Sequence, residues 1–166
     1  MAKSTKNKLA QPFLKWAGGK RQLLPEIRKY VPKKINTYYE PFVGAGAVLF
    51  DIQPKKAVIN DINIELVNVY EMIKNHADEL IEDLRKHEND KDYFYEIRDL
   101  DRKPEYKNLS PIERASRIIY LNKTCFNGLF RVNSQGQFNV PFGKYKNPRI
   151  VNEVVIRAVH NYLSSN

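Results

Sequence analysis

The sequence predicts an α/β protein with a Rossmann-like core, and three features close together in the chain support this prediction. Residues 37–39 form a β-rich run, residues 44–46 provide a tight Gly-Ala-Gly turn, and residues 47–50 form a short apolar helix. A second short strand is predicted at residues 56–60. A strand, a glycine turn and a helix in this order form the first unit of a Rossmann-like fold.

Asp61 ends the second predicted strand, 21 residues beyond Glu40. An acidic residue at this strand tip is placed to accept hydrogen bonds from ribose hydroxyls. The dinucleotide fingerprint G-x-G-x-x-G is incomplete, because no third glycine follows Gly44 and Gly46. A ribose site without a pyrophosphate site favours a nucleoside-like cofactor, and S-adenosylmethionine fits best. Asp61 favours this interpretation over an ordinary strand turn, and a Cβ at either glycine would obstruct a bound cofactor.

Composition limits the class of protein. The 166 residues, 42% of them hydrophobic, suffice for one core, and a mean hydropathy of −0.57 indicates a soluble chain. The net charge of +9 favours a polyanionic partner such as nucleic acid, although basic soluble proteins are common. No apolar run approaches the roughly 20 residues of a membrane helix, so we expect no membrane. Residues 1–9 also lack the apolar segment of a secretory signal.

Cysteine and histidine are sparse in the sequence. The single cysteine, Cys125, excludes a disulfide framework and makes the cytoplasm the expected location. Three scattered histidines, His76, His87 and His160, add no metal-ligand spacing, so we expect no metal site.

The N-terminal part divides into a tail and a second candidate motif. Residues 1–10 are predicted to form a flexible basic tail, either a solvated terminus or an arm that contacts DNA. A phosphate-binding loop is excluded further on, because Leu14 and Arg21 replace the glycine and the Ser or Thr that it requires. Two interpretations stay open: a lid in which Trp16 packs on the cofactor and Lys20 pairs with its carboxylate, or a buried tryptophan beside a lysine at a helix start.

The middle of the sequence is predicted to be helical. Apolar residues recur at helical spacing at 62–73, 77–84 and 93–100, and the aromatic cluster at 93–95 is expected to belong to the core. Ser110 and Glu113 form a capping box, which predicts a helix that starts at the intervening proline.

This pattern implies a helical insertion after the second strand. A last helix, over residues 152–163, follows the insertion. The predicted divisions are a tail at 1–10, a cofactor-binding part at 11–63, a mainly helical subdomain at 64–148 and a returning helix at 149–166.

Residues 127–145 are the second informative stretch. Within them, residues 129–141 are predicted to form a β-hairpin with a Ser-Gln-Gly turn. A two-stranded ribbon fits the major groove of DNA. Arg131 could then make a bidentate contact with guanine, while Leu129 or Pro141 could touch a thymine methyl group. The alternative is a surface hairpin in a basic protein.

Two motifs together resemble those of the Dam-type adenine-N6 DNA methyltransferases. Residues 13–20 read Phe-Leu-Lys-Trp-Ala-Gly-Gly-Lys, residues 40–46 read Glu-Pro-Phe-Val-Gly-Ala-Gly, and the resemblance runs from about Gln11 to the end of the chain. These class-alpha amino-methyltransferases often recognise GATC and bind S-adenosylmethionine with both motifs. The cofactor-binding residues that the resemblance implies are Trp16, Ala17, Gly18, Lys20, Glu40, Pro41, Phe42, Gly44, Gly46 and Asp61.

The resemblance also matches the hairpin to the target-recognition loop of that family, with double-stranded DNA as the partner. The DNA-binding residues that it implies are Asn127, Leu129, Arg131, Asn133, Pro141, Lys144, Tyr145 and Lys146. Among the basic residues, Lys144, Lys146 and Arg149 are expected to contact phosphates, which gives affinity without sequence information.

The catalytic motif of that family is absent from the sequence. The lone pair of adenine N6 is delocalised, and the family activates it with an Asp-Pro-Pro-Tyr motif that holds the flipped-out base. Residues 139–142, Asn-Val-Pro-Phe, lack the first proline of a variant of this motif. Cys125 lacks the preceding proline of the cytosine methyltransferases and is expected to be a small buried side chain. We therefore assign no catalytic residue.

These observations lead to one main expectation and two rivals. The chain is expected to be the N-terminal portion of a site-specific adenine-N6 DNA methyltransferase, acting within GATC in DNA modification or restriction–modification. It should be inactive alone and should pair with a C-terminal catalytic portion. The first rival is a non-catalytic DNA-binding module or one half of a split methyltransferase. An NAD-binding oxidoreductase is disfavoured by the missing third glycine and the basic hairpin.

Overall fold

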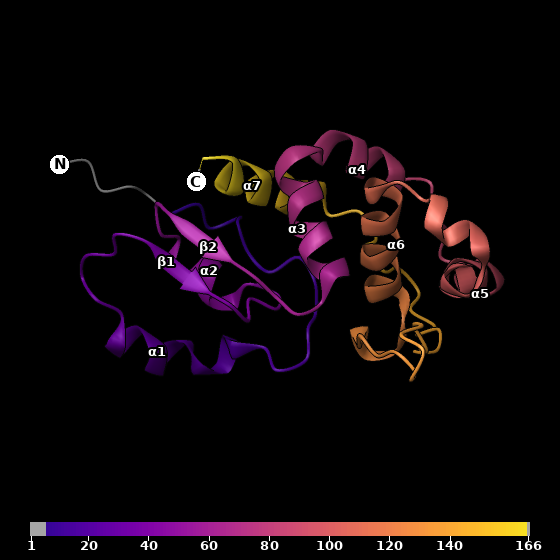
Figure 1. Ribbon diagram of the computed structural model, residues 1–166, viewed down its shortest axis with the longest axis horizontal. Coiled ribbons are helices and arrows are strands. Elements are labelled where there is room, and N and C mark those ends of the chain that lie inside the picture. The colour runs from indigo at the N-terminus through magenta and orange to yellow at the C-terminus, as the bar shows by residue number, and fades with distance from the viewer. Residues whose placement is uncertain (1–5, 166) are drawn as a thin grey trace.

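A small parallel sheet forms one end of the molecule in the computed structural model, which describes residues 6–165 (Figure 1). Strand β1 (Tyr38–Glu40) pairs with β2 (Ala57–Ile59), and Tyr38 lies opposite Ala57. Helix α2 (Ala47–Ile52) connects the two strands, which makes this segment a parallel β–α–β unit. The mixed helix and strand architecture predicted from the sequence is confirmed, and the strands predicted at 37–39 and 56–60 lie within two residues of β1 and β2.

Helices form most of the remaining described chain. The 3₁₀ helix η1 (Lys20–Leu23) and helix α1 (Leu24–Tyr30) precede the sheet. The elements after it are α3 (Ile64–Asn75), α4 (Ala77–Leu84), α5 (Lys91–Arg98), η2 (Asp99–Arg102), η3 (Pro104–Asn108), α6 (Pro111–Thr124), η4 (Phe126–Gly128) and α7 (Glu153–Ser164).

The sequence specifies where several of these helices begin. Asn63 caps α3 by accepting a hydrogen bond from the backbone N–H of Leu66 at 3.0 Å. The capping box of α6 is confirmed, because Ser110 and Glu113 each bond to the other's backbone N–H. These caps pair amide groups that the helix itself leaves without a partner.

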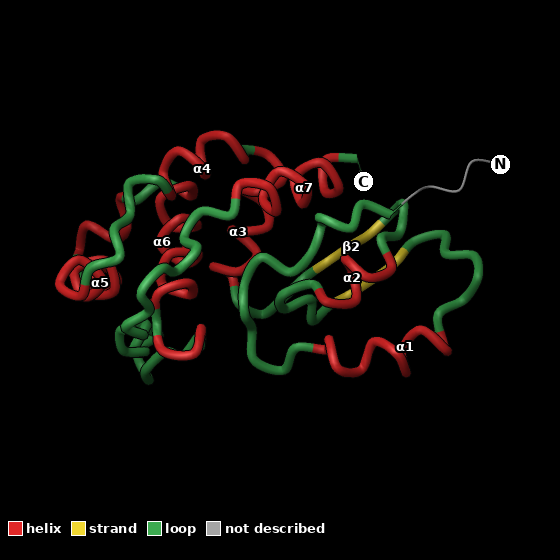
Figure 2. The backbone as a smooth tube through the Cα atoms, turned by 180° about the vertical axis from the view of Figure 1, so that it is seen from behind, coloured by secondary structure: helices red, strands yellow, loops and turns green. Residues whose placement is uncertain are grey.

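Two hydrophobic clusters meet at α6. The first contains residues of α2, α3, α4, α7 and one face of α6, including Ile118 and Ile119. The second contains Phe94 of α5, Tyr120 and Leu121 of α6, and residues from the segment after α6. The aromatic residues at 93–95 belong to this second cluster, as expected. Figures 1 and 2 show the same order from both sides: the sheet at one end, α3 and α7 in the middle, and α5 at the other end.

Half of the predicted N-terminal tail, residues 1–5, lies outside the described residues. Residues 6–10 differ from a flexible tail because they lie against α2. Asn7 and Gln53 exchange two hydrogen bonds of 2.9 and 2.8 Å, and Ala10 is buried. The reciprocal amide contact explains why this polar segment is docked on the protein.

The predicted hairpin at 129–141 is shorter than the sequence indicates. A single antiparallel bridge joins Val132 to Phe138, and neither side extends into a strand. Towards the base of the loop, the backbone pairs instead with the end of α6, where Cys125 bridges to Phe142. The ribbon ends there because Pro141 has no N–H to donate, and its carbonyl accepts instead from the N–H of Phe126 at 2.8 Å.

Within residues 6–165, no helix is both long and apolar enough to cross a membrane. The same residues contain no group of three or more His, Cys, Asp and Glu side chains that could hold a metal ion.

Candidate functional site

A pocket of about 220 Å³ lies where the β1–α2 turn meets the segment before η1. Its lining comes from three places in the sequence: residues 16–20, the turn that follows β1, and the residue after β2. The lining residues are Trp16, Ala17, Gly18, Gly19, Lys20, Phe42, Val43, Gly44, Ala45, Ala47 and Asp61.

The Gly44–Gly46 turn has a backbone that side chains would disturb. Both glycines have positive φ, +52° at Gly44 and +76° at Gly46. A Cβ at Gly44 would lie 3.3 Å from the Trp16 ring, inside the pocket, whereas one at Gly46 would lie 2.6 Å from the Phe50 ring. The first glycine therefore shapes the pocket, and the second allows the turn to pack on the core.

Two polar side chains hold this turn in place. The Asp61 carboxylate accepts hydrogen bonds from the backbone N–H groups of Gly44 and Asn63, each at 3.0 Å. The Tyr70 hydroxyl donates to the Gly44 carbonyl at 2.9 Å, and burial raises the pKa of Tyr70 well above its usual value. Each Asp61 oxygen keeps a further lone pair, so Asp61 can accept from a bound ligand without releasing the turn.

Lys20 lies at the pocket but already has protein partners. Its Nζ is 3.1 Å from Oε1 of Glu40 and donates to the Phe42 carbonyl at 2.5 Å. The Tyr38 hydroxyl donates to the second Glu40 oxygen at 2.7 Å. The buried Glu40 thus acts as an anchor for Lys20, whose ammonium retains one further N–H.

Trp16 connects the pocket to the segment after α6. Its ring stacks on Phe130, with centroids 4.8 Å apart and planes at 26°. The preceding backbone is fixed as well, because buried Asn122 of α6 accepts from Lys15 N at 3.0 Å and donates to Lys15 O at 2.8 Å. The side chain of Asn122 also donates to the Gly128 carbonyl at 3.1 Å.

Seven of the ten predicted cofactor residues line the pocket, and three do not. Glu40 is buried beneath Lys20, Gly46 faces the core, and the exposed Pro41 lies outside the lining. The sequence analysis missed Gly19, Val43, Ala45 and Ala47, all next to predicted residues. It also missed Phe130, and no spacing in the sequence pairs this residue with Trp16.

The second group of predicted residues lies on residues 126–146, which we call the 126–146 loop. In Figure 1 this segment is orange and lies at the end of α6 away from α4. Asn133 closes its tip: its Oδ1 accepts from the N–H groups of Gln135 and Gln137, each at 2.9 Å, and its amide donates to the Gln137 side chain. The Asn133 side chain therefore holds the turn, and a contact with DNA would have to be made in addition.

Arg131 lies on the exposed side of the loop and bonds to Asn139. Its Nε donates to Oδ1 of Asn139 at 2.7 Å, and an Nη donates to the Asn139 carbonyl at 3.3 Å. This contact joins the two sides of the hairpin. The other predicted DNA-binding residues, Asn127, Leu129, Pro141, Lys144, Tyr145 and Lys146, are exposed.

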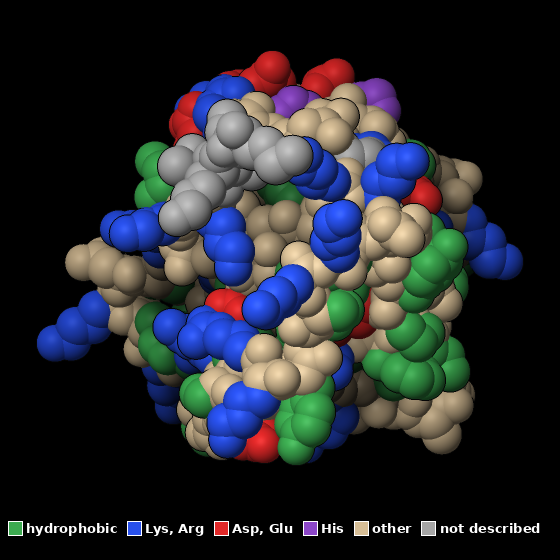
Figure 3. All heavy atoms as spheres, turned by 90° about the vertical axis from the view of Figure 1, so that its left-hand side faces the viewer, with side chains coloured by type: hydrophobic (Ala, Val, Ile, Leu, Met, Phe, Trp, Pro, Cys, Tyr) green, Lys and Arg blue, Asp and Glu red, His purple; other side chains and the backbone are tan. Residues whose placement is uncertain are grey.

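Basic charge is concentrated on the loop but extends beyond it. Residues 122–152 contain Lys123, Arg131, Lys144, Lys146 and Arg149 and no acidic residue. Figure 3 shows many Lys and Arg side chains at the sheet end as well, where Lys29, Lys33, Lys34, Lys55 and Lys56 are exposed. Net charge therefore does not locate the DNA-binding surface by itself.

Cys125 lies behind the loop and is buried, as expected. Burial raises the pKa of its thiol to about 11. A thiol with this pKa is almost entirely protonated near neutral pH, which makes it a poor nucleophile.

Comparison with known proteins identifies a family. Residues 16–166 match the model of the D12 class N6 adenine-specific DNA methyltransferases. The type II methyltransferase M1.LlaDCHI of Lactococcus lactis subsp. cremoris is 50% identical over 164 residues, which cover 97% of this chain and 58% of that protein.

Two further relatives extend this match. The type II methyltransferase M.MjaIII of Methanocaldococcus jannaschii is 43% identical, with 93% of this chain and 60% of that protein covered. The DNA adenine methylase of Escherichia coli (strain K12) is 40% identical, with 82% and 49% covered. The chain thus spans about half to three-fifths of the length of these relatives.

Proposed function

Because the chain belongs to the D12 class N6 adenine-specific DNA methyltransferase family, we propose that it is the cofactor-binding and DNA-recognition part of such an enzyme. The reaction is transfer of a methyl group from S-adenosylmethionine to adenine N6 in duplex DNA. The observation that carries the proposal is the pocket, in which Trp16, Lys20 and Asp61 come together from distant parts of the sequence.

The pocket residues suit the chemical groups of S-adenosylmethionine, which supplies a methyl group on a sulfonium when bound. Trp16 and Phe42 offer aromatic surface for an adenine ring, and Asp61 offers free lone pairs for ribose hydroxyls. The remaining N–H of Lys20 can meet a carboxylate while Glu40 and Phe42 hold its other donors. We propose the remaining predicted cofactor residues, Ala17, Gly18, Glu40, Pro41, Gly44 and Gly46, as the walls and supports of this site.

The 126–146 loop is proposed to enter the major groove, with Arg131 as the chief base reader. Arginine presents two donors that match guanine O6 and N7. Asn139 already bonds to the exposed Arg131 guanidinium, so DNA would replace this contact. Lys144, Lys146 and Arg149 supply phosphate contacts, and we propose GATC as the site, in DNA modification or restriction–modification in the cytoplasm.

The exposed sheet supports a role for a further portion of the enzyme. Tyr39 and Val58 are paired neighbours on one sheet face, and their exposed fractions are 69% and 51%. Among the described residues, β1 pairs with β2 alone. We propose that a C-terminal catalytic portion covers this face and extends the sheet. Hydrogen exchange should therefore be fast at β1 in this chain, and protection like that of an intact core would contradict the proposal.

The base-reading role is tested by Arg131→Ala with Lys146→Ala as its matched control. Binding is measured on a GATC duplex and on one with the guanine replaced, across a salt series. Arg131→Ala should reduce the discrimination, which a bidentate contact sets at about 1–3 kcal/mol. Lys146→Ala should weaken binding to both duplexes equally and flatten the log–log salt slope by about one unit. Equal loss on both duplexes for Arg131→Ala would make it a phosphate contact.

Activity separates the proposal from its rival, a non-catalytic DNA-binding module or one half of a split enzyme. We expect this chain alone to transfer no labelled methyl group to duplex DNA, because it has no Asp-Pro-Pro-Tyr motif. Addition of a polypeptide that carries the motif should restore transfer for a split enzyme. Incorporation at adenine N6 by the chain alone would contradict the assignment of no catalytic residue.

A further inference from the structure

The outer backbone edge of the 126–146 loop is bonded by side chains rather than by a strand. The backbone N–H of Asn133 donates to the backbone carbonyl of Gln137 at 2.9 Å, and the backbone N–H of Asn139 donates to that of Arg131 at 3.1 Å. Val132 and Phe138, between these bonds, form a non-hydrogen-bonded pair. In such a pair the N–H and C=O of Phe138 point away from Val132.

Two residues of η2 meet both of these groups. Oδ2 of Asp101 accepts from the Phe138 N–H at 2.7 Å, and an Nη of Arg102 donates to the Phe138 carbonyl at 2.9 Å. Asp101 and Arg102 also bond to each other at 2.8 Å. Together they take the place of a neighbouring strand, about 36 residues away along the chain.

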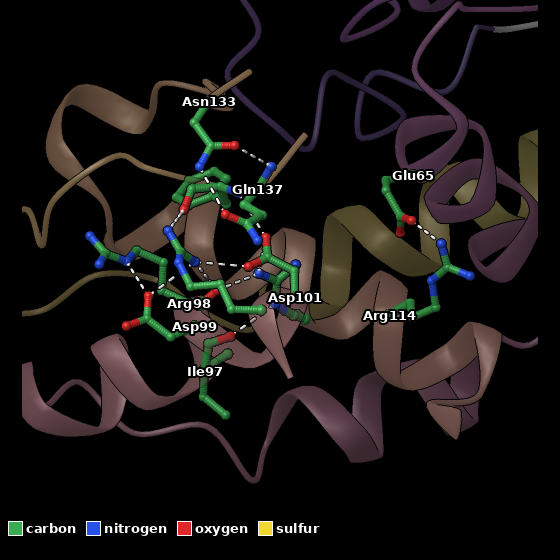
Figure 4. Close-up of polar contacts among 11 residues, drawn as sticks. Glu65, Ile97, Arg98, Asp99, Asp101, Arg114, Asn133 and Gln137 are labelled. Atoms are coloured by element: carbon green, nitrogen blue, oxygen red, sulfur yellow. Dashed lines mark hydrogen bonds and ion pairs between the residues drawn. The ribbon is translucent and has the colours of Figure 1, made fainter. Parts of the chain in front are cut away.

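Arg117 of α6 fixes this pair to the core. Its guanidinium lies 2.9 Å from Oδ2 of Asp101 and donates to the carbonyls of Ile97 and Arg98 at 2.9 and 2.6 Å. Arg117 is 3% exposed, so its charge depends on Asp101 for compensation. Figure 4 shows Asp101 between Ile97 and Arg98 on one side and the loop residues Asn133 and Gln137 on the other.

We propose that Asp101 and Arg102, held by Arg117, are positioning residues. They fix the backbone of the 126–146 loop at Phe138 and thereby determine its base discrimination. This inference rests on the proposed role of the loop in DNA recognition. Arg131 lies next to the Val132–Phe138 bridge, and its carbonyl accepts from the residue after Phe138. A shift of Phe138 therefore moves the backbone that carries Arg131.

The alternative is that this network only stabilises the fold. Other buried ion pairs do so, and removal of one partner is costly because it leaves a charge without compensation. The two roles differ in what they change. A purely structural network changes the melting temperature, whereas a positioning network changes the ratio of affinities for matched and mismatched DNA in protein that remains folded.

Asp101→Asn is the primary test in the full chain. The amide keeps a carbonyl for the Phe138 N–H but loses the charge that pairs with Arg102 and Arg117, although Arg102 retains Asp99 at 3.1 Å. Binding is measured by fluorescence anisotropy on duplexes with a randomised four-base core, after circular dichroism has shown that the protein is folded. We expect discrimination between the preferred core and its guanine-substituted form to fall at least about five-fold, with the salt slope unchanged.

Glu65→Gln is the matched control. Glu65 of α3 pairs with Arg114, which lies on α6 like Arg117. This pair lies apart from Asp101 and the loop (Figure 4). The substitution also converts a carboxylate that pairs with an α6 arginine into an amide. The Glu65–Arg114 pair connects α6 to α3 rather than to the loop. We expect a lower melting temperature and unchanged discrimination.

Arg102→Lys provides a second variant in case Asp101→Asn does not fold. Arg102 is partly exposed, so its replacement leaves no buried charge alone. Lysine keeps the charge but has no fork to bond Asp101 and the Phe138 carbonyl together. We expect an intermediate loss of discrimination.

The outcomes separate the inference from the function on which it rests. Wild-type discrimination in folded Asp101→Asn or Arg102→Lys overturns the inference and leaves the proposed function intact. Equal loss in Glu65→Gln also overturns it, because destabilisation alone would then explain the effect. A wild-type chain that prefers no core sequence overturns both.

Discussion

The pocket and the 126–146 loop both place side chains on irregular backbone, but different interactions hold the backbone in the two regions. The pocket turn is fixed by glycine conformations and by Asp61 and Tyr70, which bond directly to the turn residue Gly44. The loop is fixed by Asp101, Arg102 and Arg117, whose charges compensate one another.

This difference determines how each region should respond to change. The pocket depends on space, because a Cβ at Gly46 meets core atoms at 2.6 and 2.7 Å. The loop depends on charge and on polar groups removed from water, where an unpaired partner is expensive. Substitutions that add volume should therefore damage the first region, and substitutions or pH changes that alter charge should damage the second.

The largest effect is expected from Gly46→Ala. Its positive φ costs a non-glycine residue about 1–2 kcal/mol, and the contact with Phe50 and Tyr70 adds about 1–3 kcal/mol of overpacking. Gly44→Ala is the control, since it shares the positive φ but meets only the Trp16 ring, at 3.3 Å. Urea denaturation should show a clearly smaller loss for Gly44→Ala. Equal losses would mean that backbone conformation alone limits this turn.

Acid should weaken the cluster beneath the loop. His87 stacks on Tyr120 at 4.4 Å, and its nitrogens bond to Tyr93 and Ser116. Burial lowers the pKa of His87 to about 4, against the opposing effect of Asp83 and together with that of Lys86. Because the unfolded chain binds this proton near pH 6.5, the stabilising contribution is full above pH 6.5 and is lost as the pH falls to 4.

The size of this loss is up to about 3 kcal/mol. His87→Gln should flatten the dependence of unfolding free energy on pH between 6.5 and 4. Retention of the full slope in His87→Gln would show that another group is responsible.

Asp61→Ala should affect both cofactor affinity and stability. It removes the proposed ribose acceptor and leaves the Gly44 and Asn63 amides without a partner, at a cost of about 1–3 kcal/mol. Asn63→Ala is the control, since it removes the α3 cap, worth about 1 kcal/mol, from outside the pocket lining. Calorimetry should show weaker binding of S-adenosylmethionine for Asp61→Ala and unchanged binding for Asn63→Ala. Unchanged affinity would count against the ribose role.

The smallest effect tests the contact between the two regions. Trp16 and Phe130 form a stacked pair, which is worth about 0.5–1.5 kcal/mol beyond its buried area. Trp16→Leu, Phe130→Leu and the double variant form a cycle, and the coupling in unfolding free energy should fall in this range. Additive effects within about 0.3 kcal/mol would show that the pocket and the loop are energetically independent.

Local chemistry in the sequence was sufficient for much of the fold. The β–α–β unit, the capping box at Ser110 and the aromatic core at 93–95 each follow from neighbouring residues. Asp61 was expected near the cofactor from its place at a strand tip, and Trp16 and Lys20 from the family resemblance; all three line one pocket. The exact length of the hairpin was not predicted, because it depends on the bond from the Phe126 N–H to the Pro141 carbonyl.

The sequence by itself determined which backbone segments require support from side chains, because glycine turns, strand tips and helix ends have characteristic residues. Tertiary structure alone decided which distant side chains provide this support. Lys20 pairs with Glu40, Trp16 stacks on Phe130, and Asp101 bonds to Phe138. These pairings have no periodicity along the chain, because they arise where segments that are distant in the sequence pack together.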